Sequence, residues 1–333
     1  MEALERILDE LIEAGILSHA AVRVGQGDEV LYTAFRGGVD ENTLFDMASV
    51  TKVMATTSLA LIALDRGLIA LDDGVSKWYP NAKTIMVKHL LTHTIGIGHK
   101  PLNKEGNTYE NIAERILEIP QDIAIGTDVR YSCPGFILLG KILEQVFEKP
   151  LDVSTRELVC SPLGLARTSF LPEDKRSAVN ANVDEALRGT VNDYNCRFLG
   201  GVAGNAGLFS CLADVTRYVR FLRDRGAPLV SENTFLLAAQ NHTVGMSESR
   251  GLGFLYVDER YAQTGGMFAG GAIGQCGHTG QSVFVDYRSG LYAIILSDAT
   301  VSTVKKYGRE HYGEVMEMRA KIHMAIKQDL ESR

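Results

Sequence analysis

The segment "FDMASVTKVMATTSLALIALDRG", from Phe45 to Gly67, sets a serine and a lysine three residues apart at the start of a long apolar run. Residues i and i+3 share one face of a helix, so Ser49 and Lys52 are expected to be neighbours in space. The residues after Lys52 are apolar on nearly every side, which is typical of a central, buried helix. The sequence therefore predicts a lysine at the mouth of a core helix, with a serine beside it.

This serine–lysine pair has two interpretations. In the structural one, Ser49 caps the helix and Lys52 extends its ammonium group to water. In the chemical one, Ser49 is a nucleophile whose proton is taken by Lys52, because burial disfavours the ammonium form and lowers the pKa of a lysine. The chemical interpretation requires a further proton carrier and an oxyanion-binding site. A second Ser-x-x-Lys, Ser302 and Lys305, lies in a polar stretch and is expected to be a solvated linker.

The composition narrows the class of protein. The chain has 333 residues, of which 45% are hydrophobic, and a formal net charge of −7. This length allows a large core and more than one lobe. An acidic chain without a basic cluster is unlike a nucleic-acid binder or an anionic-membrane binder. The apolar runs are short and interrupted, so no membrane span is expected, and no feature indicates an oligomeric state.

The cysteines and the N-terminal residues indicate the compartment. The chain has five cysteines, an odd number at wide spacings without a Cys-x-x-Cys pair, which is typical of reduced thiols. The first residues, "MEALERILDELIEAG", are acidic where a signal peptide is basic, and they predict an amphipathic helix that ends at Gly15. We therefore expect a cytoplasmic protein, with a signal peptide already removed as the alternative.

Strand patterns lie near both ends of the chain, with a helical and loop-rich block between them. Residues 19–25 and 30–36 predict a hairpin, and strand patterns return in "GLGFLYV", "QSVFVDY" and "GLYAIILSD" before a last helix. Strands far apart in a sequence commonly pair in one sheet, so the block between them is expected to be an insertion. The prediction is an α/β (α+β) domain of residues 1–67 and 205–333, a helical domain of residues 68–204, and an active site in the groove between them.

Two later motifs supply the pieces that the serine–lysine pair requires. Residues 131–133, Tyr-Ser-Cys, come directly before a helix with proline in its first turn. Residues 278–280, His-Thr-Gly, lead into a strand, where the glycine permits close approach of a substrate to the backbone. With Ser49 and Lys52, these motifs predict an acyl-transfer site in which Tyr131 shares the proton transfer with Lys52.

With its three motifs in this order, the chain resembles the penicillin-recognising serine hydrolases, which include class C β-lactamases, D-alanyl-D-alanine peptidases and β-lactamase-like esterases. The connecting text is similar too, from about residue 43 to about residue 297. The resemblance implies an antiparallel sheet flanked by the N- and C-terminal helices, with an inserted helical domain. It also implies an oxyanion hole formed by the backbone N–H groups of Ser49 and Gln281, and no cofactor.

The residues expected at this site fall into two groups. The expected catalytic residues are Ser49, Lys52, Tyr131, His278 and Gln281, and the expected substrate-binding residues are Cys133, Thr279 and Gly280. Two of them depart from the family pattern. Cys133 stands where asparagine is usual, and a thiol is a poor donor and acceptor. His278 stands where class C β-lactamases have lysine, which weakens the positive charge available to a substrate carboxylate at neutral pH.

Other chemistry-bearing patterns have plainer explanations. His89 and His93 are spaced like zinc ligands, but the glutamate of His-Glu-x-x-His is missing, so structural histidines are expected. Cys276 and His278 share a strand face, yet an inert cysteine is commoner than a Cys–His pair. The glycine-rich stretches do not lie in a strand–GxGxxG–helix frame, so nucleotide binding is not expected.

The sequence thus predicts a serine hydrolase that acts through a covalent acyl-enzyme on a small ester, amide or β-lactam-like substrate. An esterase is favoured, because Cys133 and His278 both weaken recognition of the amide and carboxylate of a β-lactam. The alternatives are a D-alanyl-D-alanine carboxypeptidase, a D-aminopeptidase, a muropeptide amidase or a β-lactamase. An alternative of another class is a catalytically silent binding protein derived from this family.

Overall fold

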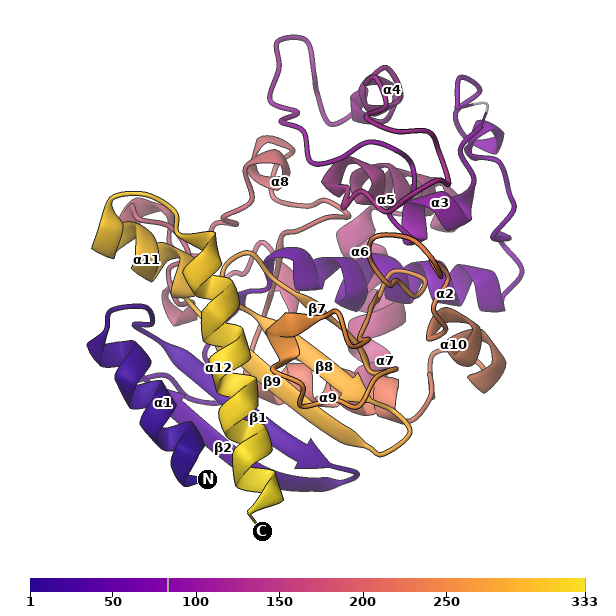
Figure 1. The fold of residues 1–333 in the computed structure, drawn as a ribbon. Helices are drawn as coiled ribbons and strands as arrows, with labels where there is room; N and C mark the ends of the chain where they lie inside the picture. The colour runs from indigo at the N-terminus through magenta and orange to yellow at the C-terminus, as the bar shows by residue number, and fades with distance from the viewer. Residues whose placement is uncertain (83, 333) are drawn as a thin grey trace.

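A six-stranded antiparallel sheet forms the centre of the protein in the computed structural model, which describes residues 1–82 and 84–332 (Figure 1). Its strand order is β2-β1-β9-β8-β7-β6. The strands are β1 (Ala20–Gln26), β2 (Glu29–Arg36), β6 (Leu255–Tyr256), β7 (Ile273–Cys276), β8 (Ser282–Asp286) and β9 (Leu291–Ser297). Because β1 pairs along its whole length with β9, the two ends of the chain share one sheet, as predicted.

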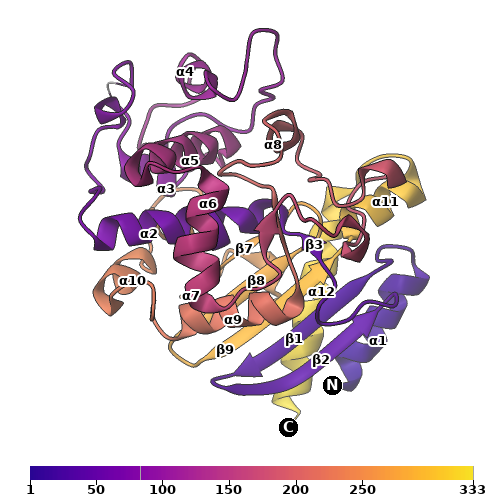
Figure 2. The same cartoon turned by 180° about the vertical axis from the view of Figure 1, so that it is seen from behind.

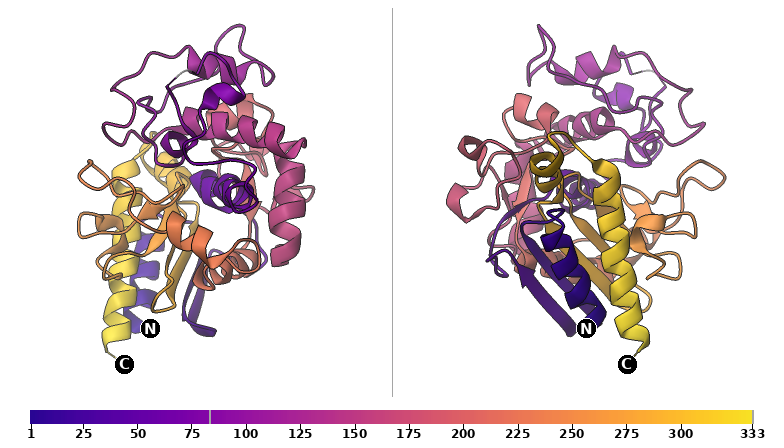
Figure 3. Two further views of the ribbon diagram at one scale, coloured as in Figure 1. Left: turned by 90° about the vertical axis from the view of Figure 1, so that its right-hand side faces the viewer. Right: turned by 60° about the vertical axis from the view of Figure 1, so that its left-hand side comes forward.

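Helices cover both faces of this sheet (Figure 3). Helices α1 (Glu2–Glu13) and α12 (Tyr312–Glu331) pack side by side on one face. On the other face, α9 (Leu212–Arg223) packs against β1, β8 and β9. In β9, Ala293 and Ile295 belong to the core beneath α1 and α12, whereas the residue between them, Ile294, belongs to the opposite core. Successive side chains of a strand point to opposite faces, so a strand covered on both faces is apolar throughout.

The remaining helices and a small sheet lie on the α9 side and above it, as the view from behind shows (Figure 2). The small sheet has the order β3-β5-β4, with β3 (Phe45–Asp46), β4 (Ser169–Phe170) and β5 (Leu208–Ser210). The helices are α3 (Val87–Leu91), α4 (Ile112–Leu117), α5 (Cys133–Phe147), α6 (Leu151–Thr155), α7 (Ser161–Leu163), α8 (Tyr194–Phe198) and α10 (Glu232–Ala238). The division into two domains at residues 67 and 205 stays a prediction.

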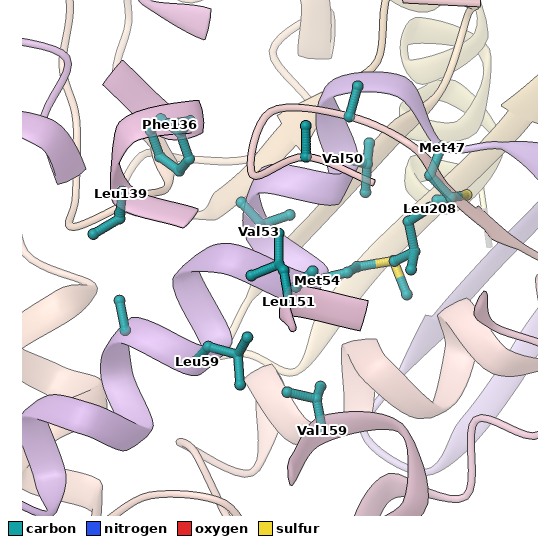
Figure 4. Packing of buried hydrophobic residues seen from close by; sticks show 14 of the residues in the cluster. Met47, Val50, Val53, Met54, Leu59, Phe136, Leu139, Leu151, Val159 and Leu208 are labelled. Atoms are coloured by element: carbon teal, nitrogen blue, oxygen red, sulfur yellow. The ribbon is translucent and has the colours of Figure 1, made fainter. Parts of the chain in front are cut away.

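The segment that follows β3 forms the central helical element. It starts as a 3₁₀ turn (Ala48–Val50), continues as a π-helical turn (Lys52–Thr57) and ends as α2 (Ser58–Asp65). Met47, Val53 and Leu59 of this region pack among side chains from α5, α6 and β5 (Figure 4). The stretch from Ala48 to Asp65 is long and apolar enough to cross a membrane, but 83% of it is buried inside the fold. Its hydrophobicity therefore belongs to the protein core.

Two expectations about the C-terminal third are wrong. Ser302 and Lys305 do not lie in a solvated linker but in helix α11 (Ala299–Tyr307), where Ser302 is 3% exposed. The contact that buries this helix is with α12, an element that a local pattern does not reveal. Strand β7 was missed as well, because "IGQC" has only one of the β-branched and aromatic residues that mark strands, Ile273.

Candidate active site

Ser49 lies in a tight turn between β3 and the central helix. Ala48, directly before it, has a φ of +45°, a left-handed conformation that is uncommon for residues other than glycine. The backbone N–H of Ala48 donates to Asp46 Oδ1 at 2.8 Å, which holds the turn in place. Backbone strain of this kind clusters at active sites. The turn presents the half-buried Ser49 at the start of the core helix.

Lys52 is fully buried and lies beside Ser49, as its spacing predicts. Its Nζ donates to Ser49 Oγ at 3.0 Å, to the carbonyl oxygen of Asn205 at 2.8 Å and to Cys133 Sγ at 3.5 Å. Burial lowers the pKa of Lys52, but the negative charges that Cys133 and Tyr131 can carry outweigh burial and raise this pKa above its usual value. The expected shift toward neutrality is therefore wrong, because the pocket that buries the lysine also supplies groups that pair with it.

Tyr131 covers the other side of Lys52. The centroid of its ring lies 5.0 Å from Lys52 Nζ, and burial raises the pKa of its hydroxyl in spite of the nearby lysine charge. The ring packs on His93 with the centroids 4.6 Å apart. His93 Nδ1 accepts the backbone N–H of Ser132 at 3.0 Å, and burial, with the charges of Arg250 and Lys52, holds the pKa of His93 well below its usual range. His93 is thus a neutral support that positions the Tyr131 segment.

Cys133 is the first residue of α5, and Ser132 caps that helix by accepting the backbone N–H of Gly135 at 3.0 Å. Burial opposes ionisation of the Cys133 thiol. The charge of Lys52 and a hydrogen bond from His99 outweigh burial, so the pKa of Cys133 lies below its usual value. The start of a helix adds to this stabilisation, since its N–H groups favour a thiolate.

The segment that packs against the turn before Ser49 ends at Gly277, three residues earlier in the chain than Gly280, the end of the predicted His-Thr-Gly motif. A β-carbon added at Gly277 would lie 2.7 Å from the carbonyl oxygen of Met47 and 3.3 Å from Cβ of Ala48, so the end of β7 packs directly against the nucleophile turn. In the described part of the chain, no group accepts the backbone N–H of Ser49, His278 or Gln281, and of these three residues only Ser49 and His278 line the cavity. Two free N–H groups beside a nucleophile are what an oxyanion hole requires.

The residues after His278 turn away from the cavity. The Thr279 hydroxyl donates to the carbonyl oxygen of Asp46 at 2.9 Å, and the Gln281 amide donates to the carbonyl oxygen of Ser297 at 3.1 Å. Gly280 has a φ of +126°, and a β-carbon there would lie 2.2 Å from Ser297 Oγ, so this glycine serves packing against the end of β9. Thr279, Gly280 and Gln281 are therefore not part of the cavity wall, contrary to their expected place at the substrate, because the hairpin between β7 and β8 turns them toward Asp46 and the end of β9.

A cavity of about 1020 Å³ brings the other expected residues together. Ser49, Tyr131, Cys133 and His278 line it, and Lys52 reaches it through Ser49 and Cys133. Sequence reasoning did not place several further residues in the cavity wall, among them His99, Arg250, Gln275 and Cys276. The only available signal was that "QCGHTG" contains two triplets that end in glycine, and the choice between them depends on strand pairing.

Metal ligation has no geometric support in this site. In residues 1–82 and 84–332, no group of three or more His, Cys, Asp or Glu side chains is arranged to hold a metal ion. His89 Nδ1 accepts the backbone N–H of Met86 at 3.1 Å, which is a local role at the start of α3. The cavity offers the side chains of a serine, a tyrosine, a cysteine and two histidines, with a lysine behind the serine.

A serine that contacts a buried lysine on the wall of a large cavity, in a fold of an antiparallel sheet covered by helices, is typical of a serine hydrolase of the β-lactamase type. The chain matches the Beta-lactamase protein family over residues 4–315 and belongs to that family. It is accordingly an enzyme, as predicted, and the predicted fold is confirmed.

Individual relatives differ in their activities. Esterase EstB from Burkholderia gladioli is 27% identical, over 89% of each chain. A putative D-alanyl-D-alanine carboxypeptidase from Escherichia coli (strain K12) is 29% identical, but the match spans 55% of this chain and 51% of the relative. Among solved structures, EstCE1, described as a hydrolase with promiscuous acyltransferase activity, has a TM-score of 0.77 over 98% of each chain at 21% identity, which shows a shared fold.

Proposed function

We propose that this enzyme hydrolyses carboxylic esters through an acyl-enzyme formed on Ser49. The observation that carries the proposal is the position of Ser49 Oγ, 3.0 Å from Lys52 Nζ and on the wall of a large cavity, with free N–H groups at Ser49 and His278. An ester needs only a nucleophile, a proton path and an oxyanion hole. The full-length similarity to esterase EstB supports the same choice.

The geometry assigns a role to each group. Ser49 Oγ attacks the carbonyl carbon, and the developing oxyanion accepts the backbone N–H groups of Ser49 and His278. Lys52 receives the proton of Ser49, and Tyr131, on the other side of Lys52, delivers a proton to the leaving alcohol. Water then attacks the acyl-enzyme by the same route in reverse. Cys133 stands where an amide-recognising asparagine is usual, so recognition of an amide substrate is weakened.

The test is to hydrolyse 4-nitrophenyl butyrate and to label the protein with a fluorophosphonate, followed by peptide mass spectrometry. One adduct per chain on Ser49, absent in Ser49→Ala, together with ester turnover, supports the proposal. An adduct on another residue would place the nucleophile elsewhere. Turnover and labelling both absent from the folded wild-type protein would favour a catalytically silent binding protein.

One observation favours a second candidate, a peptidase or β-lactamase acting on a substrate with a free carboxylate. Arg250 and Gln275 are 3% and 2% exposed and line the cavity, yet Arg250 Nε and Nη1 and Gln275 Nε2 have no hydrogen-bond partner among the described residues. The third nitrogen of Arg250, Nη2, donates to both oxygens of the Glu248 carboxylate at 2.8 Å. A substrate carboxylate would satisfy these donors.

The two candidates separate in a comparison of kcat/KM for 4-nitrophenyl butyrate, a cephalosporin and a D-alanyl-D-alanine peptide. A higher value for the ester supports the first candidate. A higher value for either carboxylate-bearing amide, reduced in Arg250→Gln, supports the second, because the charged donor would then be in use. Arg260→Gln is the matched control, since Arg260 lies outside the cavity wall and pairs with Asp258.

A further inference from the structure

The surroundings of Lys52 determine whether its amine can act as a base on its own. Its Nζ donates to three acceptors, Ser49 Oγ, the carbonyl oxygen of Asn205 and Cys133 Sγ. An ammonium group has three N–H bonds and no lone pair. The charges that Cys133 and Tyr131 can carry raise the pKa of Lys52 above its usual value, so Lys52 is protonated at neutral pH and can accept the proton of Ser49 only while it gives one of its own to a neighbour.

Cys133 is the neighbour best placed to receive that proton. Asn205 offers a carbonyl oxygen, which is not a base, and Ser49 is the proton donor of the step. Cys133 Sγ lies 3.5 Å from Lys52 Nζ, on the wall of the same cavity, and at the first residue of the fifteen-residue helix α5. A cationic neighbour and a helix N-terminus are the two features that hold a cysteine as a thiolate. His99, which also lines the cavity, adds a hydrogen bond to the sulfur.

The other charged and titratable groups around Cys133 determine how firmly the thiolate is held. These groups are Lys52 in the central helix, Tyr131 before α5, His99 in the loop after α3 and Asp193 before α8. The Asp193 carboxylate opposes a second negative charge, but it is tied to the side chain of Asn205 at 3.1 Å. Burial keeps the hydroxyl of Tyr131 protonated, so Tyr131 is a donor at rest.

We propose that Cys133, as a thiolate, takes a proton from Lys52 while Lys52 takes the proton of Ser49. The inference rests on the proposed acyl-enzyme function. In this step the Ser49 O–H bond breaks and an N–H bond forms on Lys52, a second Lys52 N–H bond breaks and an S–H bond forms on Cys133. The bond from Ser49 Oγ to the carbonyl carbon forms at the same time. The negative charge that began on sulfur ends on the oxyanion, and Lys52 stays positive beside it.

The first test compares the pH dependence of ester turnover in Cys133 variants. Cys133→Ser leaves a neutral hydroxyl, so we expect kcat to fall about 100-fold, in the range of lost general-base catalysis. Cys133→Asp returns an anion, and we expect it to recover at least tenfold over the serine variant. In the wild type, turnover should fall as pH falls through the range where the thiolate is protonated, and that limb should move in Cys133→Asp and vanish in Cys133→Ser.

Cys160→Ser is the matched control, because Cys160 is as buried as Cys133 but lies outside the cavity, and burial raises the pKa of its thiol to about 12. We expect its pH profile to follow the wild type. If Cys133→Ser and Cys133→Asp both stay within threefold of the wild type with the same pH profile, Cys133 takes no part in the proton transfer and the inference is wrong.

A second test does not depend on turnover. Iodoacetamide reacts with thiolates, so at pH 6 Cys133 should be alkylated at least tenfold faster than the equally buried Cys160, as followed by peptide mass spectrometry. Lys52→Met should abolish this advantage, because it removes the cation. Equal alkylation of the two cysteines in the wild type would overturn the inference. A fast-reacting Cys133 in a protein without ester turnover would instead overturn the proposed function and leave the thiolate in place.

Discussion

The chain carries two Ser-x-x-Lys pairs, and their surroundings differ. Lys52 is fully buried and donates to the hydroxyl of Ser49, whereas Lys305 is exposed. The hydroxyl of Ser302 instead hydrogen-bonds with the hydroxyl of Ser18 at 2.9 Å, which ties α11 to the loop before β1. Both pairs lie on helical segments, so in each pair the serine and the lysine share one face of the helix. The comparison teaches that the chemistry depends on what surrounds the lysine.

The largest expected effect is a difference in ester turnover between alanine variants of the two serines. In Ser49→Ala, we expect ester turnover to fall at least about 1000-fold, because loss of the nucleophile leaves only binding and the oxyanion hole. Ser302→Ala, which lies outside the cavity, should keep wild-type turnover. The measurement is kcat for 4-nitrophenyl butyrate in both variants, with circular dichroism as the check on folding. A similar loss in both variants would remove the distinction between the pairs.

The two lysines should differ next. Lys52→Met keeps the volume of the buried stem and removes the proton relay, so kcat should fall about 100- to 10,000-fold. Lys305→Met changes an exposed side chain and should leave kcat unchanged. Steady-state kinetics with one ester measures both. An active Lys52→Met would mean that Ser49 loses its proton to a different group.

The free energy of unfolding should depend on pH through His323 of α12, the helix on which α11 and the second pair pack. His323 in α12 is fully buried, and burial lowers its pKa to about 4 from the usual 6.5. The unfolded chain binds this proton below pH 6.5 and the folded protein does not, so stability is lost as pH falls from 6.5 to about 4. The loss is about 3 kcal/mol at about 1.4 kcal/mol per pKa unit. Urea unfolding at pH 7 and pH 4 should show a smaller loss in His323→Gln, and an equal loss would contradict the assignment.

The smallest effect concerns the role of Ser302 itself. Its hydrogen bond with Ser18 is neutral and part-buried, so Ser302→Ala should lower the free energy of unfolding by about 1 kcal/mol. Ser18→Ala should cost a similar amount, and the double variant should cost less than the sum of the two, because both changes remove the same bond. Additive costs in urea unfolding would show that the two hydroxyls do not interact.

Much of the site could be predicted because its motifs are local. The i, i+3 spacing places Ser49 and Lys52 on one face of a helix, and the proline after Cys133 marks a helix start there. The prediction of Thr279, Gly280 and Gln281 failed because the third motif belongs to a hairpin. The pairing of β7 with β8, from Ile273 with Val285 to Cys276 with Ser282, decides which triplet ends at the nucleophile. A local pattern does not contain that register.

The order of polar and apolar residues along the chain determines three features: the amphipathic first helix, the alternating strands, and the core helix with its serine and lysine. Each depends on a repeat that spans only a few neighbouring residues, so the sequence alone contains it. The protonation state of Lys52 is not determined in this way. Its acceptors Cys133 and Asn205 lie 81 and 153 residues further along the sequence, and only folding brings them to within 3.5 Å and 2.8 Å of Nζ. Electrostatic interactions act through space, so the same lysine that the sequence predicted as a neutral base is a cation in the folded protein, held between a thiol, a tyrosine and a backbone carbonyl.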